Sequence, residues 1–122
     1  MNVVLISTYD LGHQPFGLAS PAAWLKHTGV SVKCLDLTVQ KFQPHLIKKA
    51  SLVGFFLPMH TATSQAIQVI QIVKQLNPEA HLCAYGLYAP LNQEYLSELG
   101  IQSFFGGEFE EGLLQLSNVI NR

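Results

Sequence analysis

The densest group of polar side chains in the sequence follows its first apolar run. Asp10, His13 and Gln14 fall within five residues of one another. A carboxylate can accept hydrogen bonds, and a neutral imidazole can ligate a metal or carry a proton near pH 7. Another histidine, His60, follows a later apolar run. These residues could bind a polar ligand, hold a metal ion or shape the loop by hydrogen bonds.

Alternating apolar runs and helix signals must position these residues, in the pattern of βαβ units on a parallel sheet. The predicted strands cover residues 2–7, 31–37, 52–57, 81–85 and 101–105. The predicted helices cover residues 18–27 or 21–27, 44–50, 63–76, 90–99 and 110–119. Ser20 and Pro21 suit the N-cap and the first position of the first helix. The run at 52–57 is continuously apolar, so we expect it at the centre of the sheet.

Short, right-handed connections favour a three-layer α/β sandwich around a five-stranded parallel sheet. With five strands, the flavodoxin-like order 2-1-3-4-5 is the commonest solution, and its switch point lies between the first and third strands. Ligands of such sheets bind outside the carboxyl ends of the strands, at the switch point. We therefore expect residues 1–122 to form one domain with its site at that edge.

The loops that leave strands one, three, four and five should converge at this edge. A glycine pair after the last strand would let a ligand approach the backbone. A carboxylate next to it also suits the start of the last helix, because the helix dipole favours negative charge there. The candidate binding residues are Tyr9, Asp10, Gly12, His13, Gln14, Met59, His60, Thr61, Gly86, Tyr88, Gly106, Gly107 and Glu108.

Composition narrows the class of protein. Charged residues make up 12% of the chain and hydrophobic residues 48%, and so low a charged share fits a sheet buried on both faces. No stretch approaches the roughly 20 apolar residues of a membrane-spanning helix. A net charge of -1 without a basic stripe gives no reason to expect a nucleic-acid partner. Two distant cysteines and no secretion signal favour a cytoplasmic location.

Several α/β functions lack their motifs in this chain. No Gly-x-Gly-x-x-Gly follows the first strand, and there is no phosphate-binding loop ending in Gly-Lys-Ser/Thr. A phosphoacceptor domain would need an aspartate after strand three and a lysine after strand five, where this chain has Leu57-Pro58 and Gly106-Gly107. A flavin phosphate after strand one would meet the negative charge of Asp10. We expect none of these functions.

Several stretches of the chain carry a resemblance to one known family. They are Pro15–Ala19, Ala22–Leu25, Gly29–Val30, Asp36, Leu52–Gly54 and Gly107–Glu110. With them the chain resembles the cobalamin-binding-type N-terminal domain of radical S-adenosylmethionine proteins. Leu5–Gly12, Leu57–Thr63 and Ala84–Asn92 resemble more narrowly the bacterial subfamily with a CCAEP or CUAEP tail.

The resemblance implies a domain that binds cobalamin or a related small molecule. Asp10, His13 and Gln14 would orient it, and residues 59–63 and 106–108 would line the pocket. Typical members carry Asp-x-His-x-x-Gly, whose histidine ligates cobalt, whereas two residues separate Asp10 from His13 here, so His13 is not assigned that role. Members also have a Gly-Gly pair after strand four where the nucleotide tail passes. Leu87 and Tyr88 follow Gly86 instead, and we expect them to narrow that channel.

The resemblance also implies a partner, because radical chemistry needs an iron–sulfur cluster held by three closely spaced cysteines. Cys34 and Cys83 cannot supply it, so we expect no such cluster in this chain and no catalysis by the chain alone. The expected partner is a radical catalytic domain, in the same or a separate chain. Two alternatives stay open: a cofactor-free interaction domain that docks on this catalytic domain, and a metal-dependent hydrolase using Asp10, His13 and His60.

Overall fold

A computed structural model describes residues 1–9 and 16–121, and within them the chain forms one five-stranded parallel sheet. The strands are β1 (Asn2–Ser7), β2 (Ser31–Asp36), β3 (Leu52–Phe56), β4 (His81–Tyr85) and β5 (Ser103–Phe105). The helices are α1 (Phe16–Lys26), α2 (Pro44–Lys48), α3 (His60–Leu76), α4 (Tyr88–Leu91), α5 (Gln93–Glu98) and α6 (Glu110–Ile120). The strand order is β2-β1-β3-β4-β5, which confirms the predicted order.

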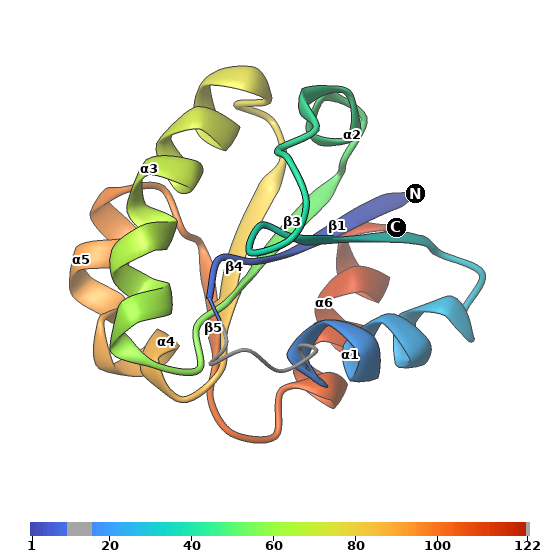
Figure 1. Cartoon of the computed structure of the whole chain (residues 1–122). Coiled ribbons are helices and arrows are strands. Elements are labelled where there is room, and N and C mark those ends of the chain that lie inside the picture. Colours follow the sequence, from blue (N-terminus) through green and yellow to red (C-terminus); the bar gives the residue numbers. More distant parts are fainter. Residues whose placement is uncertain (10–15, 122) are drawn as a thin grey trace.

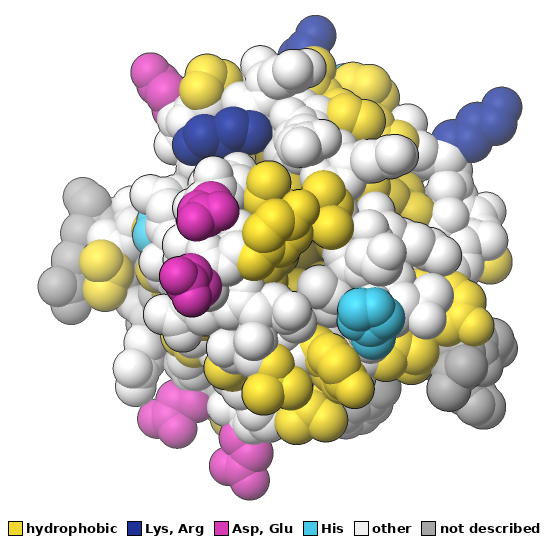
Figure 2. All heavy atoms as spheres, turned by 90° about the vertical axis from the view of Figure 1, so that its left-hand side faces the viewer, with side chains coloured by type: hydrophobic (Ala, Val, Ile, Leu, Met, Phe, Trp, Pro, Cys, Tyr) yellow, Lys and Arg dark blue, Asp and Glu magenta, His cyan; other side chains and the backbone are white. Residues whose placement is uncertain are grey.

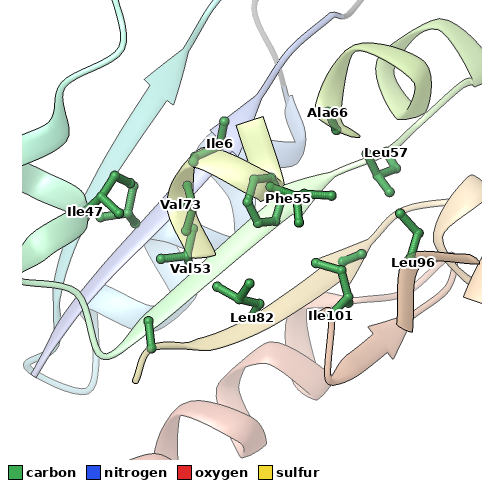
Figure 3. Close-up of a cluster of buried hydrophobic side chains, with 14 of the residues drawn as sticks. Ile6, Ile47, Val53, Phe55, Leu57, Ala66, Val73, Leu82, Leu96 and Ile101 are labelled. Atoms are coloured by element: carbon green, nitrogen blue, oxygen red, sulfur yellow. The ribbon is translucent and has the colours of Figure 1, made fainter. Parts of the chain in front are cut away.

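Helices cover both faces of the sheet, as Figure 1 shows, with α1 and α6 on one face and α2 to α5 on the other. Successive residues of a strand face opposite sides. Val53 and Phe55 of β3 therefore pack under α3, in the cluster drawn in Figure 3. Leu52 and Phe56 pack under α1 and α6. All five residues of β3 are buried, which confirms that its continuous apolar run lies inside the sheet.

Helix α1 begins earlier than the sequence predicts, so Ser20 and Pro21 lie inside the helix rather than at its start. Pro21 has no N–H to donate to the carbonyl oxygen four residues earlier, that of Gly17. The hydroxyl of Tyr85 on β4 donates to this oxygen at 2.7 Å. Ser20 donates to the carboxylate of Glu110 at 2.8 Å and thereby links α1 to α6. A partner from another element thus lets the proline lie inside the helix.

The helical region after β4 also differs from the prediction. The sequence predicts one helix over residues 90–99, but two short helices cover residues 88–91 and 93–98. Asn92 separates them, with φ of -113° and ψ of 20°. Its side-chain amide donates to the carbonyl oxygen of Tyr88 at 2.9 Å, a local bond of the kind that favours helix ends.

Helix α3 starts at His60, so Thr61 lies in its first turn rather than in a loop. Nowhere in the described part of the chain is a helix long and apolar enough to cross a membrane.

Candidate functional site

The predicted site residues follow the carboxyl ends of β1, β3, β4 and β5, which meet at one edge of the parallel sheet. Tyr9 lies half-buried directly after β1. Asp10, Gly12, His13 and Gln14 lie outside the described residues, so the roles assigned to them stay predictions. The predicted metal set of Asp10, His13 and His60 stays untested for the same reason.

Backbone hydrogen bonds join the exits of β3, β4 and β5. The N–H of Leu57 donates to the carbonyl oxygen of Tyr85 at 2.7 Å, and the N–H of Tyr88 donates to that of Leu57 at 3.0 Å. The N–H of Gly86 donates to the carbonyl oxygen of Phe105 at 3.0 Å. The described candidate residues on these three loops therefore belong to one connected edge.

The exit of β1 is tied to the start of α3. The hydroxyl of Thr8 donates to the carbonyl oxygen of Ala62 at 2.7 Å. Met59 is the N-cap residue of α3 and makes no side-chain capping hydrogen bond. His60 and Thr61 follow it in the first turn, and both are exposed. An imidazole and a hydroxyl thus face solvent beside the switch point between β1 and β3.

The glycines at this edge have two different functions. Gly86 has a positive φ of 109°, and a side chain there would lie 2.8 Å from the carbonyl oxygen of Leu57. It therefore permits the close approach of two loops and leaves no space for a ligand. At Gly107 a Cβ atom would have nothing within 4 Å, and at Gly106 its nearest neighbour would be Pro90 at 3.6 Å. Backbone is accessible at this glycine pair.

A small hollow lies beside the start of α6. It holds about 220 Å³ and is lined by Trp24, Glu108, Glu110 and Glu111. Ligand sites usually begin at about 300 Å³, so this hollow is small for a cofactor. Trp24 lies on its wall with 46% of its surface exposed.

Ser7 is a candidate site residue that sequence reasoning missed. It ends β1 and is fully buried, and its hydroxyl has no hydrogen-bond partner among the residues that the structure describes. In the sheet register it lies between Asp36 of β2 and Phe56 of β3. Most buried polar side chains have a partner, so this hydroxyl needs an explanation. The signal was present in the sequence, since a hydroxyl residue ends an apolar strand at the predicted switch point.

An aromatic cluster fills the interior directly beneath the edge, on the face covered by α1 and α6. The ring centroids of Phe56 and Tyr85 lie 5.5 Å apart, and those of Tyr85 and Phe109 lie 4.8 Å apart. Phe56 and Phe109 complete the triangle at 5.9 Å. The first turn of α1 closes over this cluster, because a Cβ atom at Gly17 would collide with the Phe56 ring. The space between α1 and the sheet is occupied by the protein itself.

The expectation that Leu87 and Tyr88 narrow a ligand channel stays a prediction, and their side chains lie in different surroundings. Leu87 is 64% exposed. Tyr88 packs against the hydrophobic cluster under α3, on the other face of the sheet. Phe56, Tyr85 and Phe109 fill the interior on the face covered by α1 and α6. In the sequence, Phe56 and Tyr85 could not be distinguished from ordinary core residues. Their contact depends on the register between β3 and β4.

Burial keeps the titratable groups beneath the edge neutral. Desolvation raises the pKa of the Tyr85 phenol well above 10, so the hydroxyl remains a hydrogen-bond donor at physiological pH. Burial likewise raises the pKa of the Cys83 thiol to about 12 and raises that of Cys34. No group of three His, Cys, Asp or Glu side chains among residues 1–9 and 16–121 is placed to hold a metal ion.

Comparison with known proteins places the chain by fold. No protein-family model matches it, and no curated protein matches it. A flavodoxin from the domain Archaea aligns over 100% of both chains with a TM-score of 0.68 and 10% identity. A CheY-like receiver domain from Methanospirillum hungatei JF-1 aligns over 98% of this chain and 93% of its own, with a TM-score of 0.66 and 12% identity. A response regulator from Thermotoga maritima aligns over 98% and 96%, with a TM-score of 0.64 and 12% identity. The chain therefore has the flavodoxin- and receiver-like α/β fold.

Proposed function

We propose that residues 1–122 form a small-molecule-binding domain of the cobalamin-binding type that serves a radical S-adenosylmethionine enzyme. The ligand, cobalamin or a related molecule, would lie across the carboxyl ends of β1, β3 and β5. Asp10, His13 and Gln14 would orient it by hydrogen bonds. In this proposal the chain performs no catalysis alone, and the radical chemistry belongs to a catalytic domain in the same or a separate chain.

The buried hydroxyl of Ser7 is the observation that carries the ligand proposal. It lies at the end of β1, beside β3, where open α/β sheets bind their ligands. Leaving such a group without a partner costs roughly 1–3 kcal/mol. The Ser7 side chain is fully buried, so a ligand on the edge would reach it only after a local shift of the chain above it. A direct bond to the ligand, or one through a bridging water molecule, would then remove that cost. This supports a polar contact between the ligand and the end of β1.

A flat ring of the ligand could rest on the surface of the edge, whereas the interior beneath it leaves no space for a nucleotide tail. Gly106 and Gly107 leave the backbone after β5 uncovered, so a ring could rest there. The Phe56, Tyr85 and Phe109 cluster occupies the space beneath, and the Tyr85 hydroxyl is bonded to Gly17. A nucleotide tail inserted between α1 and the sheet does not fit this arrangement. The proposal is therefore restricted to a ligand that stays on the edge.

Titration of the purified chain with hydroxocobalamin, followed by absorbance and calorimetry, tests the proposal. We expect saturable binding that Gly107→Val weakens, because a branched side chain would cover the open backbone. Since nothing lies within 4 Å of a Cβ atom there, this variant should fold normally. Ser31→Val, at the exposed start of β2 on the opposite edge, is the matched control and should bind as the parent chain does. No binding up to millimolar hydroxocobalamin would exclude cobalamin as the ligand.

Ser7→Ala separates a ligand-binding hydroxyl from a merely structural one. Because the hydroxyl has no partner in the described part of the chain, its removal should leave the free energy of unfolding unchanged or raise it. The same variant should bind hydroxocobalamin more weakly. A variant that loses stability and retains the parent affinity would show that Ser7 serves the fold alone.

The second candidate function is a cofactor-free interaction domain that docks on the radical catalytic domain. The filled interior beneath the edge favours it, because side chains occupy space that a cofactor tail would need. The low charged share of 12% fits it as well, since part of the surface could be covered by another domain. This function predicts no hydroxocobalamin binding and a stable complex with a catalytic domain.

A further inference from the structure

Three large apolar side chains lie exposed along the helical segment after β4. Leu87, Leu91 and Tyr95 are 64%, 72% and 48% exposed. They are spaced four residues apart, which places them on one side of a helical path. Leu91 and Tyr95 lie on the same side across the break at Asn92, because both line one surface hollow. We call these three residues the apolar stripe.

The apolar stripe has no function in the core of this chain. The inner side of the same segment already carries Ala89 and Leu96, both fully buried under the sheet. The segment is thus apolar on two sides, a pattern that is normally buried on both. Isolated exposed apolar residues need no explanation, whereas a contiguous group indicates an interaction site. Figure 2 shows hydrophobic side chains gathered on the face formed by α3, α4 and α5.

The charged side chains within residues 87–99 have one sign, while Lys74 of α3 lies near the end of this segment, next to Gly100. A surface hollow of about 350 Å³ is lined by Leu91, Asn92, Glu94, Tyr95 and Glu98. Both glutamates are exposed, and residues 87–99 contain no lysine or arginine. Acidic side chains lie beside the hydrophobic ones in Figure 2, with a basic side chain next to them. The surface therefore combines an apolar strip with two exposed glutamates, Glu94 and Glu98.

We infer that the apolar stripe binds a basic amphipathic helix of a protein partner, whose apolar side chains cover the stripe and whose lysines or arginines pair with Glu94 and Glu98. A second copy of this chain fits less well. A two-fold interface sets the same surface against itself, so these glutamates would approach their own copies without a cation from the segment to pair with them. Leu87 follows the exit of β4, but Leu91 and Tyr95 are not among the proposed ligand contacts, and this inference does not rest on those contacts. It would supply the surface that the second candidate function requires.

A synthetic amphipathic peptide of leucine and lysine is the probe, and its twin with glutamate in place of lysine is the peptide control. Fluorescence anisotropy of the labelled peptides with the full chain should show binding of the lysine peptide only. Leu91→Ser with Tyr95→Ser should weaken that binding at least about tenfold, which corresponds to about 1.4 kcal/mol. Glu94→Gln with Glu98→Gln should weaken it and reduce its salt dependence. Amide NMR shifts caused by the peptide should concentrate at residues 87–99.

The matched control is Val39→Ser with Val119→Ser, which removes two apolar side chains that are 79% and 59% exposed elsewhere on the surface. All these positions are exposed, so the variants should keep the thermal midpoint of the parent. Equal weakening in the control variant, or equal binding of the glutamate peptide, would overturn the inference. So would self-association in sedimentation equilibrium that Leu91→Ser with Tyr95→Ser abolishes, because the occupant would then be a second copy. Hydroxocobalamin is absent from these measurements, so their outcome is independent of the ligand proposal.

Discussion

At the scale of single residues, one missing side chain decides how closely α1 approaches the sheet. A Cβ atom at Gly17 would meet three carbon atoms of the Phe56 ring. That ring cannot simply move away, because Tyr85 and Phe109 pack against it at centroid distances of 5.5 and 5.9 Å. Protein interiors of this density transmit such a change as strain. Glycine is therefore needed for packing here, without any requirement on its φ angle.

Gly17→Ala should destabilise the fold although alanine is the better helix former. Replacing glycine inside a helix gains about 1 kcal/mol. Overpacking a filled core costs roughly 1–3 kcal/mol, and the tight contact with Phe56 places this site at the upper end. We expect the free energy of unfolding, measured by urea denaturation, to fall by about 1–2 kcal/mol.

Gly107→Ala is the matched control for this substitution, because a Cβ atom there would touch nothing within 4 Å. Its free energy of unfolding should stay within about 0.5 kcal/mol of the parent value. A Gly17→Ala variant that is more stable than the parent would show that α1 can move away from the sheet at no cost.

The contacts of single side chains were also the feature that could be predicted least well from the sequence. Residue types marked the exits of the strands, and Met59, His60, Gly106 and Gly107 do follow the carboxyl ends of β3 and β5. The side chains that fill the interior beneath those exits could not be predicted, because they depend on which residues of neighbouring strands lie side by side in the sheet. The register places Phe56 beside Tyr85. No spacing within the sequence encodes that contact.

At the scale of elements, α1 depends on a hydrogen bond from another strand. Pro21 cannot donate to the carbonyl oxygen of Gly17. Tyr85, which is 68 residues away in the chain, donates to it at 2.7 Å. Burial raises the pKa of Tyr85 far above physiological pH, so the donor is always protonated there. The first turn of α1 is in this way attached to β4.

A double-mutant cycle between Pro21→Ala and Tyr85→Phe tests this attachment. Tyr85→Phe alone leaves the Gly17 carbonyl oxygen without that donor and should cost roughly 1–3 kcal/mol. In the Pro21→Ala background the helix can make its own bond to Gly17, so the cost of Tyr85→Phe should fall by at least about 0.5 kcal/mol. The measurement is urea unfolding of the four proteins. Strict additivity of the two substitutions would contradict the attachment.

The same bond explains why the sequence misplaced the start of α1. Local rules favour Ser20 as an N-cap and Pro21 at the first helical position. These rules consider only the helix's own donors, and the donor here comes from β4. Asn92 is the corresponding case at α4 and α5, where a side-chain amide competing for the Tyr88 carbonyl oxygen interrupts a predicted single helix. The first error concerns where a helix starts and the second how many helices follow β4, whereas the five strands, their order and the remaining helices were predicted correctly.

At the scale of the whole molecule, the hydrophobic pattern and general rules for the connections were together enough to order the sheet. A continuously apolar run must be buried on both faces, and β3 is buried at all five of its positions. Short, right-handed connections then leave few possible orders, and the observed order β2-β1-β3-β4-β5 is the commonest one. The two outer strands of the sheet, β2 and β5, are less deeply buried. All three residues of β5 are only half-buried, and β2 alternates between buried and exposed positions.

This decrease in burial from the central strands to the outer strands predicts the order in which parts of the fold open. Amide hydrogens of β1, β3 and β4 should exchange only through global unfolding, because helices on both faces and strands on both sides protect them. Amides of β5 should exchange faster through local opening, since this short edge strand has one neighbour, β4. Native-state hydrogen exchange with increasing urea measures both. Equal protection of β5 and β3 would mean that the sheet opens as one unit, and the ligand edge formed by β5 would then be as rigid as the core.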